Sequence, residues 1–97
     1  MSLPVIWTMP AKVQLSNLHA YISQDNPNAA DAQLELIVGA GRNLANFPEM
    51  GREGRRDGTR ELVIPGTPYI VVYRIRQASV RVLSVLHGAR RWPRRFR

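Results

Sequence analysis

The stretch from Thr59 to Trp92 restricts the fold of this 97-residue chain more than any other part of it. Three runs rich in β-branched and aromatic residues follow one another there, separated first by Pro65-Gly66-Thr67-Pro68 and then by Gln77-Ala78-Ser79. Proline and glycine mark turns, and short polar connections between β-rich runs are typical of hairpins. We therefore predict a three-stranded antiparallel meander.

The residues before this stretch show a strand followed by a helix. Leu3 to Trp7 is apolar and β-leaning, and Thr8 with Pro10 is typical of a helix N-terminus. The apolar residues that follow recur at helical spacing on one face until about Gln24: Ala11, Leu15, Leu18 and Ile22.

A second helix is predicted to begin with Asn26 as its cap and Pro27 in its first turn, and to end at about Asn46. Its apolar face consists of Ala30, Leu34, Ile37, Gly41 and Leu44. The short connection favours an antiparallel helix hairpin. Gly39 and Gly41 lie inside this helix, where we expect both to allow close packing of the backbone against a neighbour. The chain is thus a single α+β domain, residues 1–97.

The strands of the meander have two apolar faces. Tyr69, Val71, Tyr73 and Ile75 alternate with Ile70, Val72, Arg74 and Arg76, and in the next strand Val80, Val82, Ser84 and Leu86 alternate with Arg81, Leu83, Val85 and His87. Both faces therefore need cover. The helices are expected to cover one face, and either a partner or the C-terminal segment, with Trp92 and Phe96, the other. Residues 48–59 are predicted to form a surface loop.

The charge is divided unequally along the chain. Residues 1–50 carry two basic and four acidic residues, a net charge of −2, whereas residues 51–97 carry twelve arginines and three acidic residues, a net charge of +9. Such asymmetry indicates an anionic partner, which is a nucleic acid, an acidic protein segment or a membrane surface.

The composition excludes several classes of protein. The chain contains no cysteine, which rules out disulfides and cysteine-ligated metal sites. No apolar run is long enough to span a membrane, and the N-terminus lacks the basic start of a signal peptide. We expect a cytoplasmic protein without metal or cofactor.

The order of these elements resembles the RelE/ParE family of bacterial type II toxins. The blocks that carry the resemblance are Trp7-Thr8, Tyr21 to Pro27, Phe47 to Arg52, Thr59 to Val63, Tyr69 to Arg74 and Val85 to Pro93. The resemblance implies a mixed sheet of about four strands with two helices on one face. It also implies a ParD-like or RelB-like antitoxin that wraps the toxin.

The family has two activities, and the resemblance leaves both open. RelE-like members cleave messenger RNA on the ribosome. In that branch an arginine commonly stands where this chain has Ile70, and some members have a tyrosine where the nearest aromatic here is Phe96. A ribonuclease would be left with His87 as acid or base and with three phosphate-binding arginines, Arg90, Arg81 and Arg60.

ParE-like members poison DNA gyrase by binding to it, which requires no catalytic acid or base. The interleaved basic and aromatic terminus fits this branch and gives the predicted target-binding residues: Arg90, Arg91, Trp92, Arg94, Arg95 and Phe96, followed by Arg97. Its rings either pack on the sheet or insert into a pocket. For the antitoxin we expect contacts with the helix hairpin and the open sheet, at Leu15, Leu18, Ile22, Leu34, Ile37, Arg74 and Arg76.

The favoured hypothesis is a non-enzymatic gyrase-inhibiting toxin. The second is a ribosome-dependent endoribonuclease of the same fold, and the third is a small basic nucleic-acid-binding module. Removal of residues 91–97 is expected to abolish gyrase inhibition and to leave the fold intact.

Overall fold

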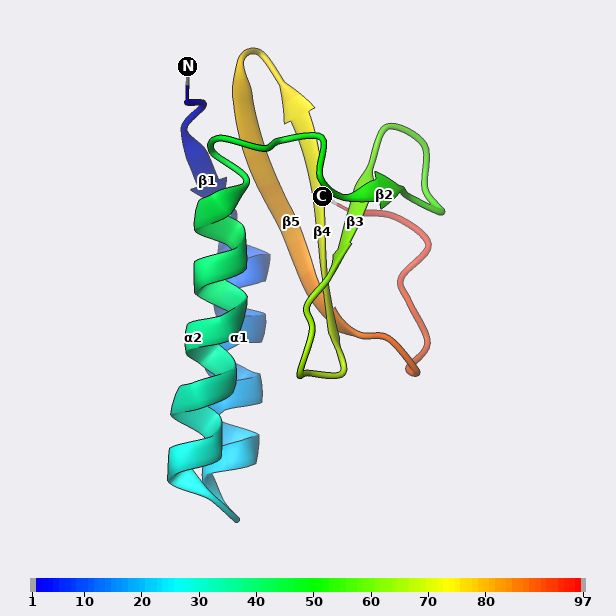
Figure 1. The fold of residues 1–97 in the computed structure, drawn as a ribbon. Coiled ribbons are helices and arrows are strands. Elements are labelled where there is room, and N and C mark those ends of the chain that lie inside the picture. The colour runs from blue at the N-terminus through cyan, green and yellow to red at the C-terminus, as the bar shows by residue number, and fades with distance from the viewer. Residues whose placement is uncertain (1, 97) are drawn as a thin grey trace.

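The computed structural model describes residues 2–96 and has three layers. Two antiparallel helices form the first, a five-stranded sheet the second, and the chain after the last strand the third (Figure 1). We call the sheet face under the helices the helix side. Residues 90–96 are called the tail, and the opposite face, on which they lie, the tail side.

The sheet has the order β1-β5-β4-β3-β2 and is mixed. The three inner strands form the predicted meander and pair antiparallel. They are β3 (Arg60–Val63), β4 (Tyr69–Arg76) and β5 (Ser79–His87). The N-terminal strand β1 (Val5–Trp7) lies parallel to β5 at one edge. The predicted α+β fold is therefore confirmed.

The predicted loop of residues 48–59 was partly wrong, because it contains a fifth strand, β2 (Arg52–Glu53). This strand pairs antiparallel with β3, so that Arg52 lies opposite Glu61 and Glu53 opposite Arg60. Both cross-strand pairs join opposite charges, which stabilise such a short edge strand.

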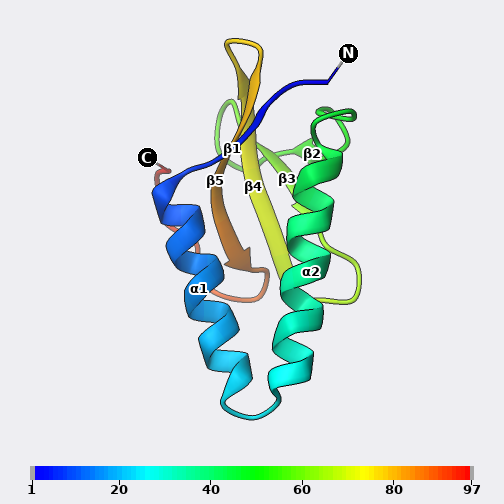
Figure 2. The same ribbon diagram turned by 90° about the vertical axis from the view of Figure 1, so that its left-hand side faces the viewer.

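Both predicted helices are present, α1 (Met9–Ser23) and α2 (Pro27–Asn43), and Figure 2 shows them side by side across the sheet. The Asn26 side chain caps α2 as predicted, accepting a hydrogen bond from the Ala29 N–H at 3.0 Å. Thr8 occupies the cap position of α1, but its hydroxyl donates to the Val82 carbonyl of β5 instead, at 2.7 Å.

The second helix ends three residues before the predicted Asn46. Its chain continues in tighter turns, in which the N–H groups of Leu44, Ala45 and Asn46 each bond the carbonyl three residues back. No helix within residues 2–96 is long and apolar enough to cross a membrane.

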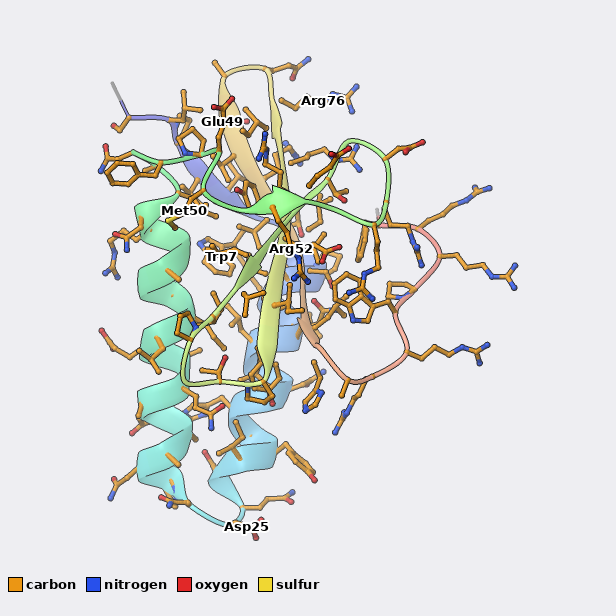
Figure 3. All side chains as sticks on the ribbon, turned by 45° about the vertical axis from the view of Figure 1, so that its right-hand side comes forward. Trp7, Asp25, Glu49, Met50, Arg52 and Arg76 are labelled. Carbon is orange, nitrogen blue, oxygen red and sulfur yellow. The ribbon has the colours of Figure 1, made fainter. Side chains whose placement is uncertain are left out.

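The main core lies between the helices and the sheet. Its buried side chains come from the two helices, the turn after α2 and the central strands, and include Ala11, Leu18, Ile37, Leu44, Val71, Tyr73, Val80 and Val82. Trp7 of β1 packs against the same core and lies beside α2 (Figure 3). Adding a Cβ at Gly41 would place it on the Trp7 ring, so the predicted close packing is confirmed there. At Gly39 the prediction was wrong, because no atom lies within 4 Å of the added Cβ.

A bulge in β5 changes which residues face the helices. Tyr73 pairs with Val82 and Val72 with Ser84, so Leu83 has no partner across the ladder. One extra residue shifts the alternation by one position. As a result Val85 lies in the main core and Leu86 on the tail side, the reverse of the predicted alternation.

The tail side has a second, smaller core that the chain closes itself. Trp92 is buried there against Ile70 and Val72, and Leu86 and Phe96 pack around them. The predicted cover by the C-terminal segment is therefore confirmed, and the two aromatic rings pack on the sheet.

Candidate functional site

A groove between α1 and the end of β5 collects the polar side chains that the sequence singled out there. It has a volume of about 420 Å³. Three of the polar site residues predicted from the sequence line it, His87, Arg90 and Arg91, together with Tyr69 of β4 and with Gln14, Asn17 and Tyr21 of α1. We call it the α1–β5 groove. Its lining contains no acidic residue, so it offers hydrogen-bond donors and positive charge.

One hydrogen bond at His87 favours a particular tautomer of its neutral ring. Its Nδ1 accepts a hydrogen bond from the Ala89 N–H at 3.2 Å, and its ring meets the Tyr69 ring edge-on, with centroids 5.7 Å apart. A neutral imidazole whose Nδ1 is an acceptor carries its proton on Nε2. In its neutral form His87 therefore presents a hydrogen-bond donor at Nε2, which suits binding.

The four residues proposed for a ribonuclease do not converge. His87 and Arg90 line the same groove, but Arg81 lies nearer the other end of β5, roughly 20 Å away along the strand. Arg81 pairs with Arg74 on the tail side, whereas His87 pairs with Tyr69 on the helix side. Arg60 lies on β3, where its guanidinium donates to the Gly51 carbonyl at 2.8 Å.

The tail is fixed to the sheet by the loop around β2. The Arg55 guanidinium stacks over the Trp92 ring, 3.5 Å from its centroid. Arg56 donates to the Pro93 carbonyl at 2.9 Å, and the Trp92 indole N–H to the His87 carbonyl at 3.3 Å. The arginines of the predicted loop thus have a structural role that their position between glycines does not indicate.

The Glu61 carboxylate holds the segment around β2 in place. It is almost fully buried and accepts hydrogen bonds from the Arg52 guanidinium at 3.0 Å and the Arg55 backbone N–H at 2.8 Å. Figure 3 shows Arg52 lying across the tail side of the sheet. Burial by itself would raise the pKa of the Glu61 carboxyl, but the bonds and charges of Arg55 and Arg52 together hold that pKa below its ordinary value.

The predicted target-binding residues divide into two groups. Arg90, Arg91, Arg94 and Arg95 are exposed, and within residues 2–96 none of them forms an ion pair. Trp92 is buried and Phe96 half-buried, so their rings hold the tail in place and do not face solvent. Arg97 lies outside the described residues.

The structure places the predicted antitoxin-binding residues of the helices in the main core or partly buried beside it. Leu18 and Ile37 are buried in the main core, and Leu15 and Ile22 pack against it. Leu34 is half-buried. The regular spacing marked the face that covers the sheet. The exposed apolar residues of α1 are instead Met9, Val13 and Tyr21, which recur four or eight positions apart on another face.

His19 is half-buried and bonds Asp31 of α2 at 2.7 Å, so it joins the two helices. Arg74 is half-buried and Arg76 exposed near the turn between β4 and β5. Among residues 2–96 no three His, Cys, Asp or Glu side chains gather as metal ligands would.

Residues 5–92 match the family described as "ParE toxin of type II toxin-antitoxin system, parDE". The chain is 42% identical over 87 residues to a candidate toxin of Sinorhizobium fredii, Y4kP, and the match covers 90% of each protein. It is 31% identical over 86 residues to toxin RelE2 of Caulobacter vibrioides, covering 89% of this chain and 96% of that one.

Two solved structures have the same fold. A chain of the chromosomal ParDE system of P. aeruginosa superposes with a TM-score of 0.77 at 21% identity, over 87% of this chain and 94% of the other. A chain of the toxin–antitoxin complex RelBE2 of Mycobacterium tuberculosis gives a TM-score of 0.59 at 26% identity, over 90% and 99%.

Proposed function

Because the chain belongs to the ParE toxin family of type II toxin–antitoxin systems, we propose that it stops growth by binding DNA gyrase on cleaved DNA. The observation that carries this proposal is the docked tail. It covers the tail side of the sheet with Trp92 and presents four exposed arginines to solvent. A surface of fixed positive charges binds phosphate or acidic protein without covalent chemistry.

The geometry of the site supports a toxin that acts by binding its target more than one that catalyses RNA cleavage. Cleavage of RNA by attack of a ribose 2′-OH needs a base to take the hydroxyl proton and a charge on the phosphate. Arg81 and Arg60 lie away from His87, whose neutral ring presents a donor at Nε2. The α1–β5 groove is therefore proposed to continue the binding surface of the tail.

The proposal includes a polypeptide antitoxin. The two solved structures with this fold come from a ParDE system and from a RelBE2 toxin–antitoxin complex. An antitoxin of the ParD-like or RelB-like kind that masks the arginines would neutralise this toxin by charge complementarity. Both partners would then meet in the cytoplasm.

The test is DNA supercoiling by purified bacterial gyrase with and without this protein, with a count of linear DNA after denaturation. Wild-type protein is expected to reduce supercoiling and to accumulate cleaved DNA. Arg94→Gln with Arg95→Gln should raise the half-inhibitory concentration about tenfold, because two binding charges are lost. Lys12→Gln with Arg42→Gln removes the same charge from exposed positions of the helices and should leave inhibition unchanged.

These substitutions replace the truncation of residues 91–97. Trp92 belongs to the second core, so the truncation would uncover Ile70 and Val72 and affect the fold. Full inhibition by folded Arg94→Gln/Arg95→Gln protein would contradict the role given to the tail. The absence of any inhibition by wild-type protein would contradict the gyrase proposal itself.

The ribonuclease reading keeps one supporting observation, the common groove of His87 and Arg90. In that reading protonated His87 would donate its Nε2–H to the leaving 5′ oxygen, and water would take the proton of the attacking 2′-OH, since the groove lining contains no carboxylate. Incubation with ribosomes and messenger RNA tests it, since cleavage lost in His87→Gln would support an enzyme. Growth inhibition that persists in His87→Gln would count against one.

A further inference from the structure

Three arginines near the tip of the β4–β5 hairpin form a second basic site, separate from the tail. Arg74 and Arg76 alternate along β4 onto the tail side, and Arg81 of β5 lies directly opposite Arg74. Together with Gln77 and Leu83 they line a cavity of about 340 Å³. We call them the hairpin arginine cluster.

The cluster carries a charge that the described protein does not balance. None of its three guanidinium groups forms an ion pair with any of residues 2–96. Arg74 and Arg81 face each other across two paired strands, an arrangement that destabilises a sheet when both residues are charged alike. The Nε–H of Arg74 is withdrawn from solvent and finds no acceptor within the same described range. A buried donor without an acceptor carries a free-energy cost.

The local backbone holds these side chains together. Gln77 and Ala78 form a tight two-residue turn with φ values of 53° and 56°, which fixes the register of Arg76 with Ser79. The Ser79 hydroxyl donates to the Arg76 carbonyl at 2.9 Å. Leu83, the bulged residue of β5, is buried and forms the apolar part of the cavity lining. The cluster therefore occupies fixed positions on two paired strands, with Arg74 half-buried and Arg76 and Arg81 exposed.

From this unbalanced, prearranged cluster we infer that the hairpin binds the carboxylates of an acidic polypeptide segment. Guanidinium groups pair with carboxylates through two parallel hydrogen bonds, and three of them accommodate closely spaced Glu or Asp side chains. The apolar Leu83 suits the stem of such a side chain. A carboxylate on a flexible side chain can reach the recessed Arg74. A phosphate of a DNA duplex is part of a wide, rigid helix and reaches such a position less easily.

The inference assigns the hairpin arginines to the antitoxin alone, whereas the tail arginines bind gyrase when the antitoxin is absent and are masked when it is bound. The hairpin tip precedes β5 and the tail follows it, and Figure 3 shows Arg76 beside the hairpin tip. The inference rests on the proposed function only in naming the antitoxin as the polypeptide. An antitoxin segment seated here would stay bound while other parts of it cover the tail.

The test measures binding of a short fluorescein-labelled peptide of alternating glutamate and alanine, by anisotropy at low salt. Arg76→Gln with Arg81→Gln is expected to weaken binding about tenfold or more, because charge-assisted hydrogen bonds are lost. The control pair Lys12→Gln with Arg42→Gln removes the same charge and should bind as wild type does. A peptide with glutamine in place of glutamate should not bind. Thermal unfolding first verifies that both pairs are folded.

A second measurement reports on Arg74 itself. Its side-chain Nε–H signal in a nitrogen–proton spectrum, assigned by its loss in Arg74→Lys, is expected to shift when the glutamate peptide is added. Equal binding by all variants, or an unmoved Arg74 signal in saturated protein, would overturn the inference. So would loss of DNA-duplex binding in Arg76→Gln/Arg81→Gln with unchanged peptide binding, since that result identifies a phosphate site.

The two proposals fail separately. The peptide experiment contains no gyrase, and the supercoiling experiment contains no antitoxin. Arg76→Gln/Arg81→Gln protein that has lost the peptide but still inhibits gyrase would support both proposals. The same protein without effect on gyrase would show that the hairpin also contacts the target, which contradicts the assignment of the hairpin arginines to the antitoxin alone.

Discussion

Single residues in this protein connect segments that are far apart in the chain. The Tyr73 hydroxyl donates to the Pro48 carbonyl at 2.7 Å and accepts from the Gly51 N–H at 2.8 Å. It thereby fixes the segment that leads into β2. Burial raises the pKa of the Tyr73 hydroxyl, and Glu49 adds to this, against opposing effects of Gly51 and Arg60. The alternation of β4 predicted that Tyr73 points inward, but not which backbone groups its hydroxyl meets.

Replacement of Tyr73 by Phe should lower the free energy of unfolding by about 1–3 kcal/mol, because a buried N–H and a carbonyl lose their partner. Urea unfolding measures this loss, and Tyr21→Phe, on an exposed ring, is the control. The raised pKa means that the neutral hydroxyl stabilises the fold fully below its ordinary value of 10.0, and that this stability is lost as the pH rises through the folded value. The difference in the free energy of unfolding between wild type and Tyr73→Phe should therefore become smaller in strong alkali. A constant difference would contradict this.

The stack of Arg55 on Trp92 is the residue-scale contact that holds the tail. Arg55→Ala should speed tryptic cleavage after Arg91 and Arg94 by up to about tenfold, because the tail leaves the sheet more often. Mass spectrometry of the fragments over time measures the rate. Arg52→Ala is the matched control, since it also removes a hydrogen bond to Glu61 but does not touch the ring. Equal rates in both variants would show that the stack does not hold the tail.

At the scale of elements, helix α2 shows how two like residues in one pattern serve different purposes. Gly41 lies against the Trp7 ring of β1, whereas Gly39 has free space around it. Nothing in the sequence distinguishes the two positions, because the distinction depends on where β1 lies relative to the helix.

Gly39→Ala is therefore expected to stabilise the protein by up to about 1 kcal/mol through helix propensity. Gly41→Ala should destabilise it by about 1–3 kcal/mol, because the new methyl group overlaps the Trp7 ring. Thermal unfolding of the two variants side by side is the measurement. Similar effects of the same sign in both would be inconsistent with the packing described.

At the scale of the whole molecule, the chain has two cores on opposite faces of one sheet, and the second depends on a buried charge. Glu61 holds Arg55, which in turn covers Trp92. Because the pKa of Glu61 is lowered from 4.5, its carboxylate contributes stability above that value, and this contribution is lost as the pH falls through the lower, folded value.

The tail should consequently leave the sheet in acid, at a pH below 4.5, before the main core unfolds. The indole N–H signal of Trp92, assigned by Trp92→Phe, reports this release as a function of pH. In Glu61→Gln protein the signal should already be altered at neutral pH and should show no acid step. A wild-type step that persists in Glu61→Gln would assign the titration to another group.

Local patterns in the sequence were sufficient to predict most of the helices and strands and their order along the chain. Helical spacing, Asn26 as a cap and the Pro/Gly turns depend on neighbours within a few residues, so α1, α2 and the β3–β5 meander could be predicted, as could the family. The two apolar faces of the meander likewise predicted cover on both sides, since an exposed apolar face is unfavourable in water.

Only the tertiary structure decided which of these residues remain available to a partner. The helix face predicted to bind an antitoxin is buried, because regular apolar spacing marks a face that packs without saying against what. The bulge at Leu83 exchanged the sheet faces on which the following residues of β5 lie. The pairing of β2 with β3 and the stack of Arg55 on Trp92 join segments that no local sequence pattern links. Distant charges such as Arg74 and Arg81 become one site only when the strands pair. The sequence alone therefore determined the fold and the basic character, and the packing of strands, helices and tail determined the sites.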